Sequence, residues 1–434
     1  HYTIKRTAVT PYGTAYQPLG SIGETEIRYT QIDQDFLVGY DNQVTDRLNV
    51  SAFVGVNGNS VEQETLSLNG DRFIVPGLED IGNTENASRS RGYSKRKIGS
   101  VYGSAEVSWD NWAYLTFTGR NDWFSTLSFP GKTTPNDDFY PSISGSVIFS
   151  ELFDLGDAIN FLKLRGGYSQ VAGGAQDPYQ LSLTYQIFGQ QHLGQSLGQI
   201  NGGNVPNANL VAYNKDETEI GVDARFLGNR LSVDLAYYTN LTKNDIVPVT
   251  TSVFSGYGSA LANIGEVENK GIELLISGTP VQTENFYWKS SFNISHNKSE
   301  IVATNDDDAE IGLGEPRTRN VEIKQIVGEE FGTIVGVSYV RDDAGNIVYD
   351  IDGDGVPIAQ LGPRKILGVG VPPTQWGWSN TFSYRNWSLF FLIDGKSGGQ
   401  IFSGTNAILT GNGLHKNTVE GRDCLLYTSD AADD

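Results

Sequence analysis

The sequence predicts an all-β fold in which antiparallel strands cross a membrane as a barrel. Apolar and polar residues alternate through most of the 434 residues, as they do in strands with two different faces. Many alternating runs are about 9–11 residues long, which suits a tilted transmembrane strand better than a soluble strand of about 5–6. Short turns also alternate with long polar loops, a pattern typical of membrane barrels.

Residues 218–240 show the alternation most clearly, as two runs around a turn at residues 227–230. One side of the two runs is apolar: Ile220, Val222, Ala224, Phe226, Leu231, Val233, Leu235 and Tyr237. The other side carries the charges: Glu219, Asp223, Arg225 and Asp234. The pattern predicts a hairpin whose apolar side faces lipid and whose charged side faces water and braces the wall.

The same alternation recurs along the chain, and sustained helical periodicity is missing. The other alternating runs are residues 48–56, 113–118, 162–165, 272–277, 286–294 and 387–393. Long polar segments lie between them, at residues 122–141, 188–209 and 305–319. A soluble sandwich or propeller would bury the apolar face instead. The strand lengths favour the membrane barrel, and so do aromatic residues near strand ends: Trp109, Trp112, Trp288 and Trp387.

Composition and hydropathy argue against one class of partner and one kind of membrane segment. The formal net charge of −20 argues against a nucleic-acid partner, because phosphate binding needs an excess of Lys and Arg. No run of 18 apolar residues predicts a transmembrane helix. The chain begins at His1 and has no Met, so we expect a piece of a longer protein. Residues 424–434, which hold the only Cys, are expected to be a non-native tail translated from a sequencing adapter.

Several segments resemble the barrel of SusC/RagA-type TonB-dependent outer-membrane transporters. They are FLKLRGGYSQVAG (161–173), NIGEVENKGIELLISGTPV (263–281), FNISHNKSEIV (292–302), VGEEFGTIVGVSYV (327–340), FLIDGKSGGQIFSGTNA (391–407) and GLHKNTVEGRD (413–423). The resemblance covers nearly all of residues 90–423, and the order of the segments makes it specific.

The resemblance implies a plugged barrel, and barrels of this transporter class have about 22 strands. The alternation predicts roughly 14–18 strands here. We therefore expect residues 1–423 to form a partial barrel with long extracellular loops. The plug, the TonB-contacting segment and several strands, the last one included, would be missing.

The resemblance also implies a function. The protein would import oligosaccharides, or peptides, across the outer membrane of a Bacteroidota-like bacterium. TonB would supply the energy, a SusD-like lipoprotein would close the barrel as a lid, and the protein would not be an enzyme. The alternative is a surface-exposed glycan-binding or adhesive β protein without transport activity. A secreted glycoside hydrolase is a further competitor, but no acidic pair stands in a recognisable glycosidase context.

The polar segment near residues 179–204 holds the candidate substrate-binding residues. They combine aromatic rings with amides: Tyr179, Tyr185, Phe188, Gln190, Gln191, Asn201 and Asn204. A sugar ring needs both kinds of group, because it has an apolar face and a rim of hydroxyls. The alternative interpretation is a polar loop with no role in binding.

Residues 350–355 (DIDGDG) match the first half of a calcium-binding loop, with Asp350, Asp352 and Asp354 as candidate ligands. An EF-hand is excluded, since Leu361 occupies the position of its bidentate Glu. A structural calcium ion remains possible, and so does a plain Asp/Gly turn. No other cofactor is required. The scattered histidines and the GKSGG segment at 395–399 predict no catalytic residue.

Overall fold

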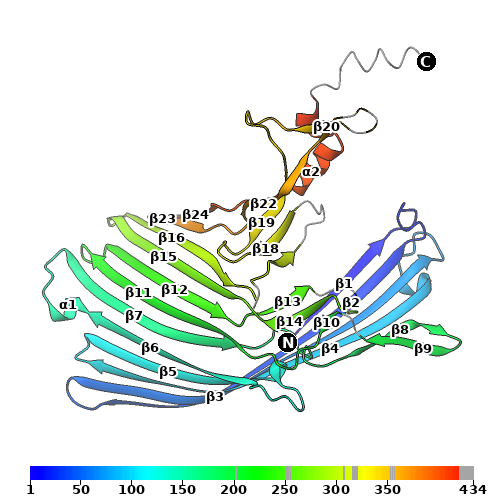
Figure 1. Cartoon of the computed structure of the whole chain (residues 1–434). Coiled ribbons are helices and arrows are strands. Elements are labelled where there is room, and N and C mark those ends of the chain that lie inside the picture. Colours follow the sequence, from blue (N-terminus) through cyan, green and yellow to red (C-terminus); the bar gives the residue numbers. More distant parts are fainter. Residues whose placement is uncertain are drawn as a thin grey trace. The chain divides into compact units, whose positions relative to one another are not determined.

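The computed structural model describes residues 1–200, 203–250, 254, 256–305, 308–314, 321–351, 353, 355 and 357–419. Of these, residues 186, 188–191, 250 and 314 are described by their backbone alone. Strands make up most of this part of the chain, and the helices are few and short (Figure 1). The all-β prediction is confirmed. No described helix is long and apolar enough to cross a membrane. The predicted adapter-derived tail, residues 424–434, lies outside the described residues.

Thirteen of the described strands form one sheet, and its neighbours follow the order of the chain. The strands are β1 (Tyr2–Thr10), β2 (Ser21–Gln43), β3 (Leu48–Phe73), β4 (Thr84–Trp109), β5 (Ala113–Phe124), β6 (Asp137–Ile148), β7 (Ile159–Gly173), β11 (Tyr213–Phe226), β12 (Leu231–Lys243), β15 (Glu266–Gln282), β16 (Phe286–Ala303), β23 (Thr374–Tyr384) and β24 (Trp387–Ser397). In this order β1 and β24 stand at the two ends, so the described strands form part of a barrel wall and do not close it.

Smaller sheets are inserted between these strands in the chain. They contain β8 (Tyr185–His192) and β9 (Gln195–Ile200); β10 (Asn204–Val205), β13 (Ile246–Thr250) and β14 (Ser259–Asn263); β17 (Ile311–Gly314), β18 (Val321–Gln325), β19 (Thr333–Tyr339) and β22 (Leu361–Val369); and β20 (Tyr349–Ile351) and β21 (Pro357–Ala359). The short helices are α1 (Phe149–Leu152), α2 (Gly404–Gly411), and the 3-10 turns η1 (Ile81–Asn83), η2 (Ser125–Leu127) and η4 (Lys416–Thr418). The thirteen described strands of the large sheet are fewer than the roughly 14–18 strands that the alternation predicts.

The predicted hairpin at residues 218–240 is present as β11 and β12. Its turn has positive φ at Leu227, Gly228 and Asn229, the left-handed region that Gly and Asn tolerate best. Asn160 holds the turn from outside, since its Oδ1 accepts the backbone N–H groups of Gly228 (2.6 Å) and Asn229 (3.3 Å). On the predicted lipid face, Ile220 and Leu235 are exposed.

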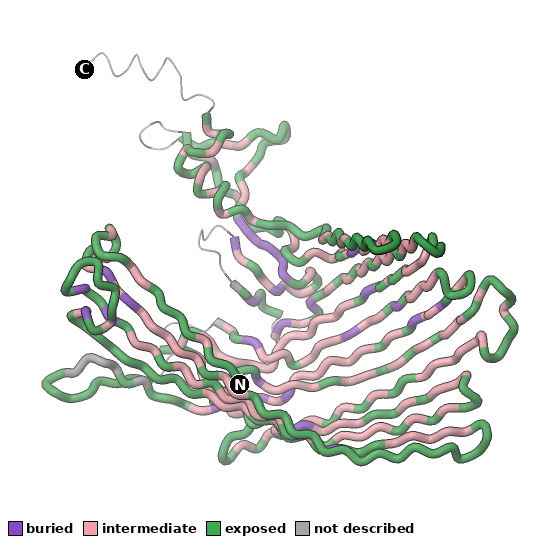
Figure 2. The backbone as a smooth tube through the Cα atoms, turned by 180° about the vertical axis from the view of Figure 1, so that it is seen from behind, coloured by how far each residue is buried: buried purple, intermediate pink, exposed green. Residues whose placement is uncertain are grey.

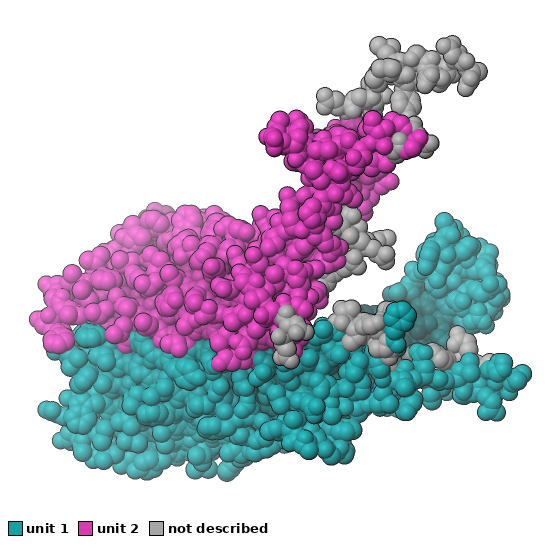
Figure 3. Space-filling model, in the orientation of Figure 1, with its two compact units in different colours: residues 1–152, 165–217, 244–263 teal, residues 153–164, 218–243, 264–434 magenta. Residues whose placement is uncertain are grey.

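The chain divides into two compact units (Figure 3). Unit 1 consists of His1–Leu152, Arg165–Glu217 and Asn244–Asn263. Unit 2 consists of Phe153–Leu164, Thr218–Lys243 and Ile264–Asp434.

Unit 1 exposes one apolar face on strands β2 to β6. Phe36 pairs with Val56, and Val38 pairs with Val54, so their side chains share a face of the sheet. Phe36 is 68% and Val54 is 66% exposed, fractions that no soluble core would leave. The face continues through other exposed residues: Val101, Val107, Leu115, Phe117 and Ile143. Figure 2 shows how few residues along the strands are buried. A continuous exposed apolar face is what a lipid-facing sheet requires.

The only buried apolar cluster found among the described residues lies in unit 1, away from that face. It consists of Phe124, Leu127, Ala175, Leu210 and Ala212. Ile246 of β13 and Leu261 of β14 pack against it. The cluster therefore anchors the three-stranded sheet β10–β14–β13, which carries part of the candidate site.

Unit 2 has an aromatic cluster on the apolar face of β16, β23 and β24. The Trp288 and Phe382 rings stack with centroids 5.6 Å apart, and the Phe382 and Phe391 rings lie 6.1 Å apart. The indole N–H of Trp288 donates to Asn380 Oδ1 (3.0 Å). The cluster lies near the short β23–β24 turn, beside Trp387. Aromatic residues at strand ends are typical of the interface between membrane and water.

Candidate functional site

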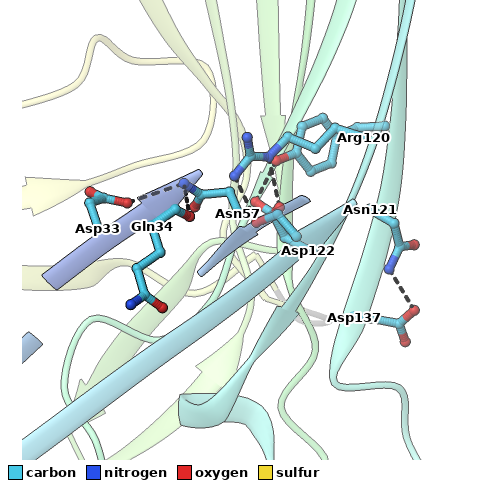
Figure 4. Close-up of polar contacts among 9 residues, drawn as sticks. Asp33, Gln34, Asn57, Arg120, Asn121, Asp122 and Asp137 are labelled. Atoms are coloured by element: carbon cyan, nitrogen blue, oxygen red, sulfur yellow. Dashed lines mark hydrogen bonds and ion pairs between the residues drawn. The ribbon is translucent and has the colours of Figure 1, made fainter. Parts of the chain in front are cut away.

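The face of unit 1 opposite the apolar face carries a hydrogen-bonded network of charged and polar side chains. Arg120 Nε lies 2.7 Å from Asp122 Oδ1, and Arg120 Nη2 donates to Ser100 Oγ (2.8 Å). The hydroxyl of Tyr140 donates to the other oxygen of Asp122 (2.5 Å). Figure 4 shows Arg120 and Asp122 together on this face, with a separate contact between Asn121 and Asp137 (3.1 Å). Strands β4, β5 and β6 are thus joined by side chains as well as by backbone.

The network continues toward β2 and β3. Tyr102 donates to Asp35 Oδ1 (2.5 Å), and its ring lies under the Arg120 guanidinium, 5.5 Å from the centroid. Asn57 and Asn59 both donate to Asp33, at 3.2 and 3.0 Å. These charges are satisfied on a surface that suits contact with water, as the inner wall of a transport barrel would be.

A related contact recurs in both units, where a tyrosine ring lies over a glycine of the neighbouring strand. Tyr238 of β12 covers Gly271 of β15, and its hydroxyl donates to Asn297 of β16 (3.0 Å). Tyr102 of β4 covers Gly55 of β3 in the same way and reaches Asp35 of β2. Each tyrosine therefore connects three neighbouring strands, which fixes their register.

The predicted charges of the β11–β12 hairpin also have partners. Arg225 lies 3.8 Å from Asp223 and stands over the Phe161 ring, 4.8 Å from its centroid. Asp223 and Arg225 share one strand, whereas the contact of Arg225 with Phe161 connects β11 to β7, which is compatible with the wall-bracing role that the sequence predicts.

A cavity of about 500 Å³ lies in unit 1, beside the end of β7 and the small sheet β10–β14–β13. Its polar lining comes from Gln176, Asp177, Gln180, Asn204, Tyr213, Asp245 and Ser259. Its apolar lining comes from Ala175, Ile246, Pro248 and Leu261, of which Ala175, Ile246 and Leu261 also belong to or contact the buried cluster. Polar side chains thus outnumber apolar ones in this lining, and convergent polar groups are what fixes the orientation of a bound ligand.

Long-range hydrogen bonds hold the loops around this cavity. The Asn263 side chain accepts from Val211 N (2.8 Å) and donates to the carbonyls of Val211 and Asn244, both at 2.9 Å. Lys132 donates to the carbonyls of Leu127 and Leu210, both at 2.6 Å. Burial lowers the pKa of Lys132 below its usual value, because the ammonium has lost part of its water shell.

Two side chains of the cavity wall hold each other in place. Asn204 Nδ2 donates to Gln180 Oε1 (3.2 Å), and Asn204 Oδ1 accepts from the hydroxyl of Ser259. Gln180 and Asn204 also line a second cavity of about 300 Å³, together with Tyr179. The two cavities therefore share the Gln180–Asn204 pair.

The structure places only some of the predicted substrate residues. Asn204 lines both cavities, and Tyr179, which is 53% exposed, lines the smaller one. Tyr185 is 72% exposed on β8 and belongs to neither lining. Asn201 lies outside the described residues, and so do the side chains of Phe188, Gln190 and Gln191.

Sequence reasoning missed Gln176, Asp177, Gln180, Asp245 and Ser259. The Gly-Gly-Ala-Gln-Asp-Pro run at 173–178 was an available signal, since it ends a strand with polar and turn-forming residues. The neighbours of Asp245 and Ser259 in the sequence give no sign of a binding site. The sheet β10–β14–β13 brings these two residues to the cavity.

The predicted calcium loop is described only in part. Asp350 is exposed on β20, whereas Asp352 and Asp354 lie outside the described residues. Elsewhere in the described part of the chain, no group of three or more His, Cys, Asp or Glu residues could hold a metal ion.

Comparison with known proteins identifies the family. The model of the TonB dependent receptor-like β-barrel matches residues 2–421. The chain belongs to the TonB-dependent receptor β-barrel family. The family consists of outer-membrane receptors of Gram-negative bacteria, so the predicted resemblance is confirmed.

The relatives of this TonB-dependent receptor segment include TonB-dependent receptor P26 of Formosa agariphila, which is 29% identical over 84% of the chain and 38% of the relative. TonB-dependent receptor SusC of Bacteroides thetaiotaomicron is 25% identical over 69% of the chain and 31% of its own length. The chain thus spans about a third of the length of these curated relatives.

A solved structure shares the fold. The RagAB peptide transporter superposes with a TM-score of 0.79 at 18% identity, covering 93% of the chain and 45% of the matched chain. The RagAB peptide importer in its open-open state gives a TM-score of 0.74 at 18% identity, covering 92% of the chain and 44% of the matched chain. The predicted partial barrel of TonB-dependent type is therefore confirmed.

Proposed function

We propose that the receptor containing this chain imports oligosaccharides, or alternatively peptides, across the outer membrane of a Bacteroidota-like bacterium. TonB supplies the energy, a SusD-like lipoprotein closes the barrel, and no covalent chemistry is involved. Likeness to SusC and to a peptide transporter supports this proposal.

The observation that carries the proposal is the two-faced sheet of unit 1. Val54 and its neighbours expose an apolar face, whereas Arg120, Asp122 and Tyr140 satisfy one another on the opposite face. A soluble adhesive β protein would bury the apolar face. A transport barrel needs that face in lipid and the polar face around a watery passage.

Substrate contact is assigned to the loops of unit 1. Asn204 and Tyr179 line cavities, and we propose that Tyr185, Phe188, Gln190, Gln191 and Asn201 extend the same binding surface. Amides and aromatic rings together suit a sugar chain, since they match its hydroxyls and its apolar ring faces.

The test is deletion of the full-length gene in its own bacterium. We expect the deletion strain to lose growth on one glycan, or on one peptide source, while growth on monosaccharides or free amino acids is unchanged. Uptake of labelled substrate should stop, and an affinity-tagged receptor should co-purify a SusD-like lipoprotein.

The adhesive alternative predicts a different result. A surface-binding protein would still bind glycan after TonB is deleted, and its loss would leave uptake unchanged. A transporter requires TonB for uptake, and its folded barrel should migrate differently on gels with and without heating. Normal growth and uptake in the deletion strain on every glycan and peptide tested would overturn the proposed function.

A further inference from the structure

The 500 Å³ cavity of unit 1 has an unusual balance of charge. Two carboxylates, Asp177 and Asp245, belong to its lining, and none of its lining residues is Lys, Arg or His. Neither carboxylate forms a hydrogen bond or ion pair with another described residue. On the polar wall the opposite holds, since Asp33, Asp35 and Asp122 all have partners. The two cavity carboxylates can therefore accept hydrogen bonds from a ligand.

Unused donors lie in the same cavity. Gln180 Oε1 accepts from Asn204, but the Gln180 amide N–H groups have no partner among the described residues. One of the two N–H groups of Asn204 Nδ2 is used by the bond to Gln180, and its Oδ1 is occupied by Ser259. The wall thus offers free carboxylate acceptors beside free amide donors.

A sugar hydroxyl matches this wall because it donates and accepts at once. A carboxylate oxygen accepts a hydrogen bond from the hydroxyl, and an amide N–H donates one to the hydroxyl oxygen. A sulfate or carboxylate group would use the amides but would meet the two Asp carboxylates with like charge, which disfavours its binding because no cation of the lining compensates. An ammonium group would satisfy Asp177 and Asp245 and leave the amides unused.

We propose that this cavity binds uncharged, hydroxyl-rich segments of an oligosaccharide and excludes anionic glycans and acidic peptides. Asp177 and Asp245 accept hydrogen bonds from the sugar hydroxyls, while Gln180 and Asn204 donate hydrogen bonds to the hydroxyl oxygens. The inference rests on the proposed import function, and it names the substrate class of that receptor.

The test uses the full-length receptor in lipid nanodiscs. Two pools are offered together: neutral oligosaccharides, and the same oligosaccharides carrying sulfate or uronate groups. A tryptic peptide pool is offered separately, and retained ligands are identified by mass spectrometry. We expect neutral oligosaccharides to be retained at least about tenfold over their anionic counterparts.

Variants assign the selectivity to the cavity. The Asp177→Asn, Asp245→Asn receptor should lose most of that discrimination while keeping its fold, because neither carboxylate has a partner among the residues that the structure describes. Glu79→Gln with Asp343→Asn removes the same number of charges from exposed loop positions and should leave the discrimination unchanged.

The outcomes separate the two proposals. Preferred retention of anionic oligosaccharides or of peptides overturns the neutral-glycan inference and leaves import standing. The neutral-glycan inference is also overturned if the cavity variant and the wild type prefer neutral over anionic oligosaccharides to the same extent. Retention of nothing from any pool, together with normal growth of the deletion strain, overturns the proposed function itself.

Discussion

Replacing Gly271 with alanine is expected to destabilise the barrel wall, although alanine is normally the better residue inside a strand. A Cβ at position 271 would lie 2.5 Å from both Cζ and Oη of Tyr238, closer than any real contact allows. The ring must therefore move, and overpacking of this kind costs about 1–3 kcal/mol. Its movement also breaks the bond to Asn297 (3.0 Å), which contributes about 1 kcal/mol. The usual gain of about 0.5–1 kcal/mol for Gly→Ala offsets part of this. The net loss should be about 1–3.5 kcal/mol.

Gly278→Ala is the matched control on the same strand. There a Cβ would meet the Arg230 carbonyl at 3.4 Å, an ordinary contact, so stability should stay unchanged or rise slightly. The assay is urea unfolding of the full-length receptor in detergent, read by the heat-dependent shift on gels. Tyr238→Ala combined with Gly271→Ala should cost less than the sum of the two single changes, because the clash is gone. Equal stabilities for Gly271→Ala and Gly278→Ala would refute the reasoning.

Three further predictions concern the loops and the inserted sheets. Lys132→Met removes the hydrogen bonds to the Leu127 and Leu210 carbonyls, so the protein should lose stability on the order of 2 kcal/mol. Proteolysis of residues 128–136 should become faster, and an unchanged cleavage rate would contradict the predicted role of Lys132. Arg364 beside Glu322 lowers the pKa of that carboxyl below its usual 4.5, so the stabilisation is present above that value and fades as the pH falls through the lowered one. The protection factors of the β18 and β22 amides, corrected for the intrinsic pH dependence of exchange, should therefore fall in the wild type as the pH drops below 4.5 and through the lowered pKa. Glu322→Gln should remove that dependence, and a Glu322→Gln curve that follows the wild type would argue against it. If the 350–354 loop binds calcium, removing the ion with a chelator should expose β20 and β21 to protease. Digestion of the Asp350→Asn variant should then be the same with and without the chelator. Identical digestion of the wild type with and without calcium would exclude the site.

The alternation in the sequence predicted the strands well where lipid lies on one side and water on the other. The β11–β12 hairpin is the clearest case, since both faces and the Gly-Asn turn follow from local residues. Strands β2, β3 and β4 are 23–26 residues long, well beyond the predicted 9–11. Their additional length is polar and paired through contacts such as Arg91 with Glu64, which a hydrophobic pattern does not reveal.

The candidate site was harder to predict because it depends on pairing at long range. Asn204 was recognised from its polar surroundings, and it does line the cavity. Asp177 and Asp245 are 68 positions apart in the sequence and meet only because β7, β13 and β14 bring their segments together. The Gly271 contact was likewise invisible, since nothing in a sequence states which tyrosine will cover a given glycine.

The orientation of the two faces on β3 is the central claim, and spin labels can measure it directly. Single cysteines at positions 50 to 57 of a full-length receptor that is otherwise free of cysteine would carry the label in lipid bilayers. We predict that labels at Val54 and Val56 are accessible to oxygen dissolved in lipid, and that labels at Gly55 and Asn57 are accessible to a water-soluble nickel complex. Equal access to the nickel complex at all of these positions would contradict the membrane barrel and return the protein to the soluble class.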